Sequence, residues 1–290
     1  MRPDPPPPEP VLSRRRELAE ASARSLLMTL LGEFVVPRDV PVWTSDLVRA
    51  LAMFAVEEKT ARQALARTAA EGWLTAQRHG RRVRWDLTAA GRSLLTDGAS
   101  RIYSFGRAQH AWDHTWLVLV VTVPEVKREL RHRLRTQLAW AGFGSPAPGV
   151  WITPEAGREA EAGQILDDLR LAGNVMSFRA SYGSIGGQES AAALAWDLDA
   201  VAGRYEAFIS EFAGLLPQPG NETLIAQTRL VHEWRRFPFL DPQLPGELLP
   251  ADWSGTRAVR LFHARHAEWA PQAQLRWDQL ITEEHAPSST

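Results

Sequence analysis

Residues 44–87 read TSDLVRALAMFAVEEKTARQALARTAAEGWLTAQRHGRRVRWDL, and they restrict the architecture more than any other segment. Apolar residues recur at helical spacing in two successive parts of this segment. The spacing predicts one helix that starts after Thr44 or Ser45 and a second helix over 57–71. Thr44 and Ser45 are both good N-caps, and Gly72 is expected to end the second helix.

Two short strands are predicted next, at 73–77 and 83–87, with Arg78-His79-Gly80-Arg81-Arg82 between them. A glycine near the tip permits the positive φ that hairpin turns require. A helix over 22–34 is expected before these elements and another over 88–103 after them. Three helices followed by a basic hairpin are the order of a winged helix-turn-helix.

The second predicted helix is polar on its outer face, since Ala61, Ala64 and Leu65 occupy the inner one. Arginine can bond guanine in bidentate fashion and glutamine can bond adenine, while hairpin arginines suit phosphates or the minor groove. The alternative is an interaction module that binds no DNA. The predicted DNA-contacting residues are Thr44, Ser45, Lys59, Thr60, Arg62, Gln63, Arg67, Arg78, Arg81, Arg82 and Arg84.

Charge is unevenly distributed along the 290 residues. The first 111 residues hold 17 Lys and Arg against 12 Asp and Glu, and the remainder holds 16 against 22, so a net of +5 precedes a net of −6. A basic first third suggests contact with a polyanion. Uneven surface charge without a partner is the alternative.

The middle of the chain predicts a second α+β domain. A nearly continuous apolar run at 115–123 is typical of a buried central strand. It is followed by a helix over about 126–138, a strand at 149–153, a helix at 157–171 and a strand at 174–180. These elements fit the βαββαβ pattern of a ferredoxin-like fold, whose remaining strand the sequence does not locate.

The last hundred residues are expected to be helical, with helices near 194–216, 222–236, 255–269 and 271–283. The apolar stripe from Leu194 to Leu216 exceeds what one small domain usually buries, so we expect a homodimer held by this region. A purely intramolecular bundle is the alternative. The predicted α+β multidomain organisation is a disordered Pro-rich tail at 1–21, a winged-helix DNA-binding domain at 22–111, a ferredoxin-like domain at 112–185 and a helical C-terminal domain at 186–290.

Composition excludes several classes of function. The absence of cysteine excludes disulfides, thiolate metal sites and cysteine nucleophiles, and it fits a cytoplasmic protein. No apolar run approaches a membrane helix, and a Pro-rich start is not a signal peptide. The histidine pairs His110/His114 and His263/His266 lack the carboxylate of a metalloprotease motif, so we expect no metal, cofactor or catalytic residue.

The residues resemble the PaaX family of phenylacetic acid degradation repressors over about 24–281. The resemblance rests on 25–33, on 61–67, on Trp116 through Pro124, and most specifically on RRFPFLDP at 235–242 and LPGELLP at 244–250. It implies a dimeric bacterial transcriptional repressor that binds a palindromic operator in double-stranded DNA. It also implies release by an aryl-acetyl-CoA thioester and a middle domain similar to the CRISPR adaptation nuclease.

Two departures from the resembled families matter. Family members often begin the recognition helix with Ser, whereas Glu57 stands here, so the operator is expected to differ. Thr122 stands where the nuclease would hold Mg²⁺ with Asp, and threonine supplies no anionic ligand. We therefore expect no catalysis, while a DNA-binding scaffold without an effector stays a possible function.

An acyl-CoA effector, with phenylacetyl-CoA the first choice, would need cations for its phosphates and an apolar wall for its acyl group. Solvated arginines and core tryptophans are the alternative interpretation of the same residues. The compatible residues are Arg128, Arg131, Arg135, Arg235 and Arg236 for the phosphates and Trp151, Trp196 and Trp234 for the wall.

Overall fold

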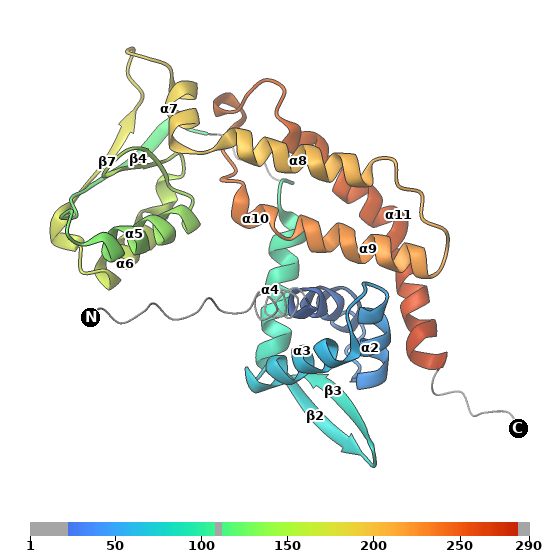
Figure 1. Cartoon of the computed structure of the whole chain (residues 1–290). Helices are drawn as coiled ribbons and strands as arrows, with labels where there is room; N and C mark the ends of the chain where they lie inside the picture. The colour runs from blue at the N-terminus through green and yellow to red at the C-terminus, as the bar shows by residue number, and fades with distance from the viewer. Residues whose placement is uncertain (1–22, 108–111, 284–290) are drawn as a thin grey trace, which may run out of the picture. The chain divides into compact units, whose positions relative to one another are not determined.

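The computed structural model describes residues 23–107 and 112–283 (Figure 1). Its contacts divide the chain into two compact units. Among the described residues, unit 1 combines 23–103 with 214–235 and 262–283, and unit 2 combines 104–107 and 112–213 with 236–261. Each unit is therefore built from segments far apart in the sequence. The predicted tail at 1–21 lies outside the described residues.

Unit 1 joins a helical core to a small sheet. Its strands pair antiparallel in the order β1-β3-β2. The short strand β1 and the π-helical turn η1 were not predicted. The elements are helical residues 23–30, η1 (Leu31–Val35), β1 (Val42–Trp43), α2 (Thr44–Ala52), α3 (Glu58–Ala70), β2 (Leu74–His79), β3 (Arg82–Leu87), α4 (Ala89–Ser104), α9 (Asn221–Trp234) and the part of α11 (Ser254–Glu283) from Phe262 onward.

The core of unit 1 explains why the predicted helical domain at 186–290 is not a unit by itself. Leu224 of α9 and Trp277 of α11 are buried in the same cluster as Leu27 and Leu65. Phe34 stacks on Trp277 with ring centroids 5.0 Å apart. Burial of large aromatic surface is the dominant stabilising term, so these late helices belong with the first hundred residues.

Unit 2 is built on a four-stranded antiparallel sheet in the order β5-β6-β4-β7. The helices α5 and α6 pack beside each other on one face of it (Figure 1). The elements are β4 (Thr115–Val121), α5 (Arg128–Trp140), β5 (Gly144–Ala147), β6 (Val150–Thr153), η2 (Ala156–Arg158), α6 (Glu159–Asp168), η3 (Ala172–Asn174), β7 (Val175–Ser181), α7 (Gln188–Ala195), α8 (Leu198–Phe212), α10 (Phe237–Leu240), η4 (Gly246–Leu248) and the first part of α11.

The strand that the sequence did not locate is β5. Its four residues, Gly-Ser-Pro-Ala, include Pro146 and do not alternate between apolar and polar, so they carry no strand signal. Two separate cores flank the sheet. Leu117, Leu119 and Trp151 are buried on the α5/α6 face, whereas Trp116 and Ile152 are buried on the other face.

Two helical predictions need correction. The expected helix at 194–216 is two helices, α7 and α8, separated at Trp196–Asp197. The expected break near 270 is absent, because α11 continues through Pro271. A proline inside a helix removes one hydrogen bond. Trp269 and Ala273, buried on either side of it, favour the continuous helix.

The central part of the apolar stripe of α8 is buried in the chain. Val201, Tyr205, Phe208 and Phe212 are buried, and Tyr205 stacks on Phe237 at 4.2 Å. The two ends of the predicted stripe, Leu194 and Leu216, remain 71% and 75% exposed, so only its central part is buried. Burial of the central part weakens the argument for a homodimer held by this stripe, and the dimer contact stays a prediction.

Candidate nucleic-acid interface

The α3 helix has one apolar and one polar face. Ala61, Ala64, Leu65 and Thr68 are buried, as their spacing predicts. The Thr68 hydroxyl donates a hydrogen bond to the carbonyl of Ala64 at 2.8 Å, so the one buried polar group on this face is satisfied. The inner face is thus fixed against the core, which holds the outer face in a defined orientation.

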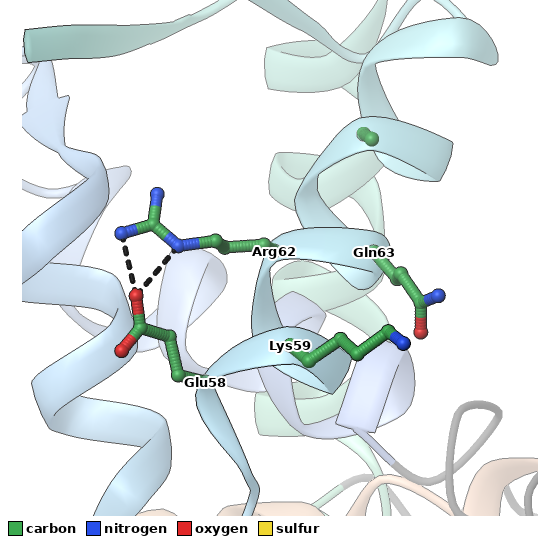
Figure 2. A pocket seen from close by; sticks show the side chains of 5 residues that line it. Glu58, Lys59, Arg62 and Gln63 are labelled. Carbon is green, nitrogen blue, oxygen red and sulfur yellow. Dashed lines mark hydrogen bonds and ion pairs between the residues drawn. The ribbon is translucent and has the colours of Figure 1, made fainter. Parts of the chain in front are cut away.

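The outer face of α3 is exposed and mostly cationic. Lys59, Arg62 and Arg67 are exposed, and Thr60 and Gln63 are half-buried. Arg62 turns back toward Glu58 and forms an ion pair of 2.7 Å, whereas Lys59 and Gln63 extend from the other side of the helix (Figure 2). These side chains border an open hollow of about 580 Å³ on the helix surface.

The β2–β3 hairpin extends beyond the helices of unit 1 (Figure 1). Its strands pair without interruption from Leu74↔Leu87 to His79↔Arg82. Gly80 turns the chain with φ +62°, a conformation that side chains other than glycine rarely adopt. Arg78 and Arg81 are exposed near this tip. The predicted hairpin and its basic tip are therefore present.

Trp43 is a feature of this surface that the sequence interpretation missed. Through β1 it pairs with Arg84 of β3. Its ring lies under two hairpin guanidinium groups, at 4.5 Å from Arg82 and 5.7 Å from Arg84, and the ring of His79 meets it edge-on at 5.4 Å. Cation–π contacts of this kind hold long arginine side chains in place. Only the cross-strand position of Trp43 could have indicated this role.

Two predicted contact residues are not available at the surface. Thr44 is only 8% exposed, donates to the carbonyl of Val83 at 3.1 Å and accepts from the Trp85 indole at 2.8 Å. The hydroxyl oxygen of Ser45 is buried as well. Both residues lie in the first turn of α2, but neither side chain caps it. We therefore remove Thr44 and Ser45 from the predicted interface.

A buried polar network centred on Glu33 connects the helices of unit 1 to one another. The carboxylate of Glu33, in the π-helical turn, accepts hydrogen bonds from the Tyr103 hydroxyl and from Gln227 at 2.7 Å, and it pairs with His266 at 3.1 Å. Gln274 donates to the Glu33 carbonyl at 2.7 Å. The partners come from α4, α9 and α11, so one side chain links four segments.

The pKa of Glu33 reflects these contacts. Burial raises the pKa of the carboxyl, but the hydrogen bond and charge of His266, together with the Tyr103 and Gln227 hydrogen bonds, outweigh burial and lower it below its usual range. A signal for this network existed in the sequence. Glu33 falls on the inward helical face defined by Leu26 and Leu30, where an unpaired carboxylate would be costly.

The α5 helix carries the three arginines that were predicted to bind effector phosphates. Arg128, Arg131 and Arg135 are all exposed. Arg131 donates to the carbonyl of Glu125 at 2.8 Å. Leu134 and Leu138 are buried on the opposite side of the helix. The arrangement is a solvated cationic face, which leaves its binding role a prediction.

The tryptophans predicted to wall an acyl group are not assembled. Trp151 is buried on the α5/α6 face of the sheet, whereas Trp196 packs against the other face, where its ring lies 6.4 Å from that of Trp116. Trp234 is fully buried in unit 1, stacked on Phe262 at 4.6 Å, and its indole N–H donates to the carbonyl of Ile102. The interpretation of one Trp-walled pocket is therefore wrong.

The remaining predicted groups are placed as follows. Arg235 belongs to unit 1, where it donates to the hydroxyl of Ser25, and Arg236 is exposed at the start of a segment of unit 2. His110 lies outside the described residues. Within the described part of the chain, no group of three or more His, Asp and Glu side chains is placed to hold a metal ion.

Family comparisons agree along the chain. Profiles described as "PaaX-like protein", "PaaX protein central Cas2-like domain" and "PaaX-like protein C-terminal domain" match residues 22–91, 109–193 and 196–279. The chain is 33% identical over 272 residues to the transcriptional repressor PaaX of Escherichia coli (strain K12), covering 87% of this chain and 82% of that protein. The chain belongs to the PaaX family. The resemblance found in the residues is thus confirmed.

A solved structure shares the fold. An uncharacterized protein, Rv0674 from Mycobacterium tuberculosis, matches with a TM-score of 0.58 at 22% identity, covering 87% of this chain and 96% of that chain. This likeness shows a mixed α and β architecture with several parts. None of the helices in 23–107 and 112–283 has the length and hydrophobicity needed to cross a bilayer.

Proposed function

We propose that this PaaX family member is a transcriptional repressor that binds double-stranded DNA through unit 1. In this proposal α2, α3 and the β2–β3 hairpin act as a winged helix-turn-helix. The observation that carries it is the placement of the exposed Lys59 and Arg62 and the half-buried Gln63 of α3 in the same unit as a hairpin with four arginines, with α3 packed against β2. A repressor of this kind acts in the cytoplasm.

The proposed contacts divide by chemistry. The α3 helix enters the major groove, where Arg62 and Gln63 meet base edges. The hairpin arginines contact phosphates, which fix register without reading sequence. Arg62 must leave Glu58 to do so, but an exposed ion pair contributes about 0–1 kcal/mol, whereas a bidentate contact to a base is worth about 1–3 kcal/mol. The exchange therefore favours binding.

The proposal includes a homodimer on a palindromic operator. A dimer related by a two-fold axis places two α3 helices in successive major grooves, about 34 Å apart. The name of the Escherichia coli relative, a transcriptional repressor, supports DNA binding and repression, while the homodimer rests on the resemblance to the PaaX family. The alternative function is a dimeric DNA-binding scaffold that responds to no small-molecule effector.

For unit 2 we propose a ferredoxin-like fold without catalysis. The order β5-β6-β4-β7, with α5 and α6 on one face, supports the fold. The profile described as Cas2-like supports it too. Thr122, which directly follows β4, argues against a nuclease because it offers no carboxylate.

We further propose that an acyl-CoA, with phenylacetyl-CoA the first to test, weakens DNA binding. Arg128, Arg131 and Arg135 are the groups that can meet its phosphates, since they share an exposed helix face. A ligand at 100 times its dissociation constant stabilises the fold by about 2.7 kcal/mol. Thermal melts with phenylacetyl-CoA, other acyl-CoAs and free acids test this. Equal melting temperatures and unchanged operator binding throughout would contradict it.

The test of DNA binding starts with the genome of the source organism. Purified full-length protein is used to capture genomic fragments, which are then sequenced and measured by fluorescence anisotropy. We expect enrichment of a palindromic site near genes of aromatic-acid catabolism. Recovery of fragments without a shared site, or equal affinity for random DNA, would overturn the proposal.

A further inference from the structure

The two edges of the unit 2 sheet are built differently. The β5 edge is four residues long, contains Pro146, shifts register between Gly144 and Ala147, and packs against α7. The β7 edge runs for seven residues and pairs with β4 in unbroken register. In the described part of the chain, no strand pairs with its other side.

Long, regular edges are normally blunted, because their unpaired N–H and C=O groups invite another strand. β5 shows three such devices: short length, a proline and a bulge. β7 has no proline, no lysine and no bulge. Its one charged residue, Arg179, forms an ion pair of 2.6 Å with Glu159. Nothing on this edge opposes pairing.

The hydrogen bonds of the sheet identify the open backbone groups. The N–H of Thr122 donates to the carbonyl of Asn174 at 3.0 Å, and these two residues extend the β4–β7 register beyond Val121↔Val175. In an antiparallel pair, alternate residues face the neighbouring strand. The even-numbered residues of β7 therefore face β4. The odd-numbered ones, such as Ser177 and Arg179, direct their N–H and C=O groups outward.

An apolar strip accompanies this edge. Met176 and Phe178 are 57% and 50% exposed. They oppose Val120 and Val118 of β4, so they lie on the face of the sheet that faces away from α5 and α6. Large apolar side chains on an unpaired edge are a marker of association.

We propose that β7 is the dimerisation strand, pairing antiparallel with β7 of a second copy around a two-fold axis at Phe178. The proposal rests on the homodimer suggested above but assigns it to a surface outside the last hundred residues. Outward-facing residues must pair with outward-facing ones, and full overlap of Val175–Ser181 then leaves one register. It places Val175 against Ser181, Met176 against Ala180, Ser177 against Arg179, and Phe178 against itself.

Charge complementarity supports a second copy as the occupant. In this register Arg179 never meets another Arg179. It lies opposite Ser177 of the other copy, whose hydroxyl is 3.3 Å from Glu159. Each Glu159 carboxylate would thus lie near an arginine from both copies. Phe178 meets Phe178 at a non-hydrogen-bonded position, where side chains approach most closely.

Single cysteines test the register, because the chain has none of its own. Phe178→Cys places two thiols across the axis, at a Cα separation of about 4.5 Å that a disulfide can span. Met176→Cys, on the same face of the same strand, faces Ala180 instead. Under mild oxidation without DNA, we expect most of the Phe178→Cys protein and little of the Met176→Cys protein to form a covalent dimer. Equal cross-linking, or none, would overturn the proposal.

Sedimentation velocity on full-length protein without DNA tests the surface independently of what the protein binds. Phe178→Lys brings two charges together at the axis, and we expect the dimer dissociation constant to rise at least tenfold. Phe239→Lys is the matched control, since Phe239 is 70% exposed elsewhere in unit 2. The proposal would be overturned if the native chain were monomeric at about 50 µM, which is near the highest practical concentration. It would also be overturned if the Phe178→Lys chain were as dimeric as the Phe239→Lys control. Loss of DNA binding would not affect either readout.

Discussion

The α3 helix of unit 1 and the α5 helix of unit 2 are both 13 residues long and both present exposed cations. Their neighbours differ. Beside α3 lies a hairpin whose Arg82 and Arg84 stack on Trp43. Beside α5 lies α6, with Glu159 and Glu161 in its first turn. A cationic helix face becomes a nucleic-acid surface where neighbouring elements add to its field rather than cancel it.

The largest expected effect separates these two helices directly. Replacing Arg62 and Gln63 together by alanine should weaken operator binding by about 2–6 kcal/mol, since each bidentate base contact is worth about 1–3 kcal/mol. Replacing Arg131 and Arg135 of α5 should leave it nearly unchanged. Anisotropy titrations on operator and scrambled DNA measure both. An equal loss from the two pairs would mean that α5 also contacts DNA.

The two units also differ in their buried carboxylates. Glu33 pairs with Tyr103 and His266, and its pKa is lowered. In unit 2, Asp241 accepts from the Tyr205 hydroxyl at 2.6 Å, but burial raises its pKa more than the hydrogen bonds from Tyr205 and the Gln243 N–H lower it. The charged form is favoured at Glu33 and disfavoured at Asp241.

This difference predicts opposite pH responses. The stability from Glu33 is present above the unfolded pKa and is lost as pH falls through the folded one, while that from Asp241 is present at low pH and lost as pH rises. Glu33→Gln should cost about 1.5–3 kcal/mol at pH 7, because hydrogen bonds to a charged group are lost. The difference in unfolding free energy between Glu33→Gln and the native protein should be smaller at pH 4 than at pH 7. For Asp241→Asn the opposite is expected: as pH falls, the native protein should become more stable relative to this variant.

Urea unfolding of the two variants and the native protein, at pH 7 and at pH 4, measures these gaps. The native protein provides the control for all other groups that titrate in this range. If the difference in unfolding free energy between native protein and variant changes with pH in the same direction for both variants, the opposite pKa shifts of Glu33 and Asp241 are contradicted.

Much of the fold was predictable because local pattern and tertiary environment agree. Periodicity located α3 and its buried Ala61, Ala64 and Leu65, and the Gly80 turn located the hairpin. The strand β5 was missed because Pro146 and the Gly144 bulge remove the alternation on which strand prediction depends. The assignment of α9 and late α11 to unit 1 depends on long-range packing, such as Phe34 on Trp277, which no local pattern encodes.

The site was predictable in residue type but not in contacts. Exposed arginines on α3 and the hairpin follow from spacing. The burial of Thr44 follows from its bonds to Val83 and Trp85, which β1 brings together only in the folded sheet. The tryptophans failed as a pocket because alternation along β6 sends Trp151 to one face of the sheet, whereas Trp196 reaches the other face from a distant part of the sequence.

A smaller effect is expected at the hairpin. Arg81→Ala and Arg82→Ala should each lower the salt slope of DNA binding by about one, since each phosphate contact releases about one counterion. Affinity should fall several-fold for operator and scrambled DNA alike. Titrations from 50 to 200 mM salt measure the slope, with Arg128→Ala of α5 as the matched control. A loss confined to the operator would instead assign these arginines to base recognition.

The smallest effect tests whether Trp43 orders the hairpin. Trp43→Leu keeps the backbone pairing with Arg84 but removes the ring under both guanidinium groups, so DNA binding should weaken by about 0.5–1 kcal/mol. The salt slope should stay constant, because both arginines remain. Trp43→Tyr should recover most of the loss, since tyrosine also offers a ring face. Trp140→Leu, which removes an 84% exposed ring from α5, should change nothing. A slope that falls by one in Trp43→Leu, or a tyrosine no better than leucine, would show that Trp43 contacts DNA itself or only supports the sheet.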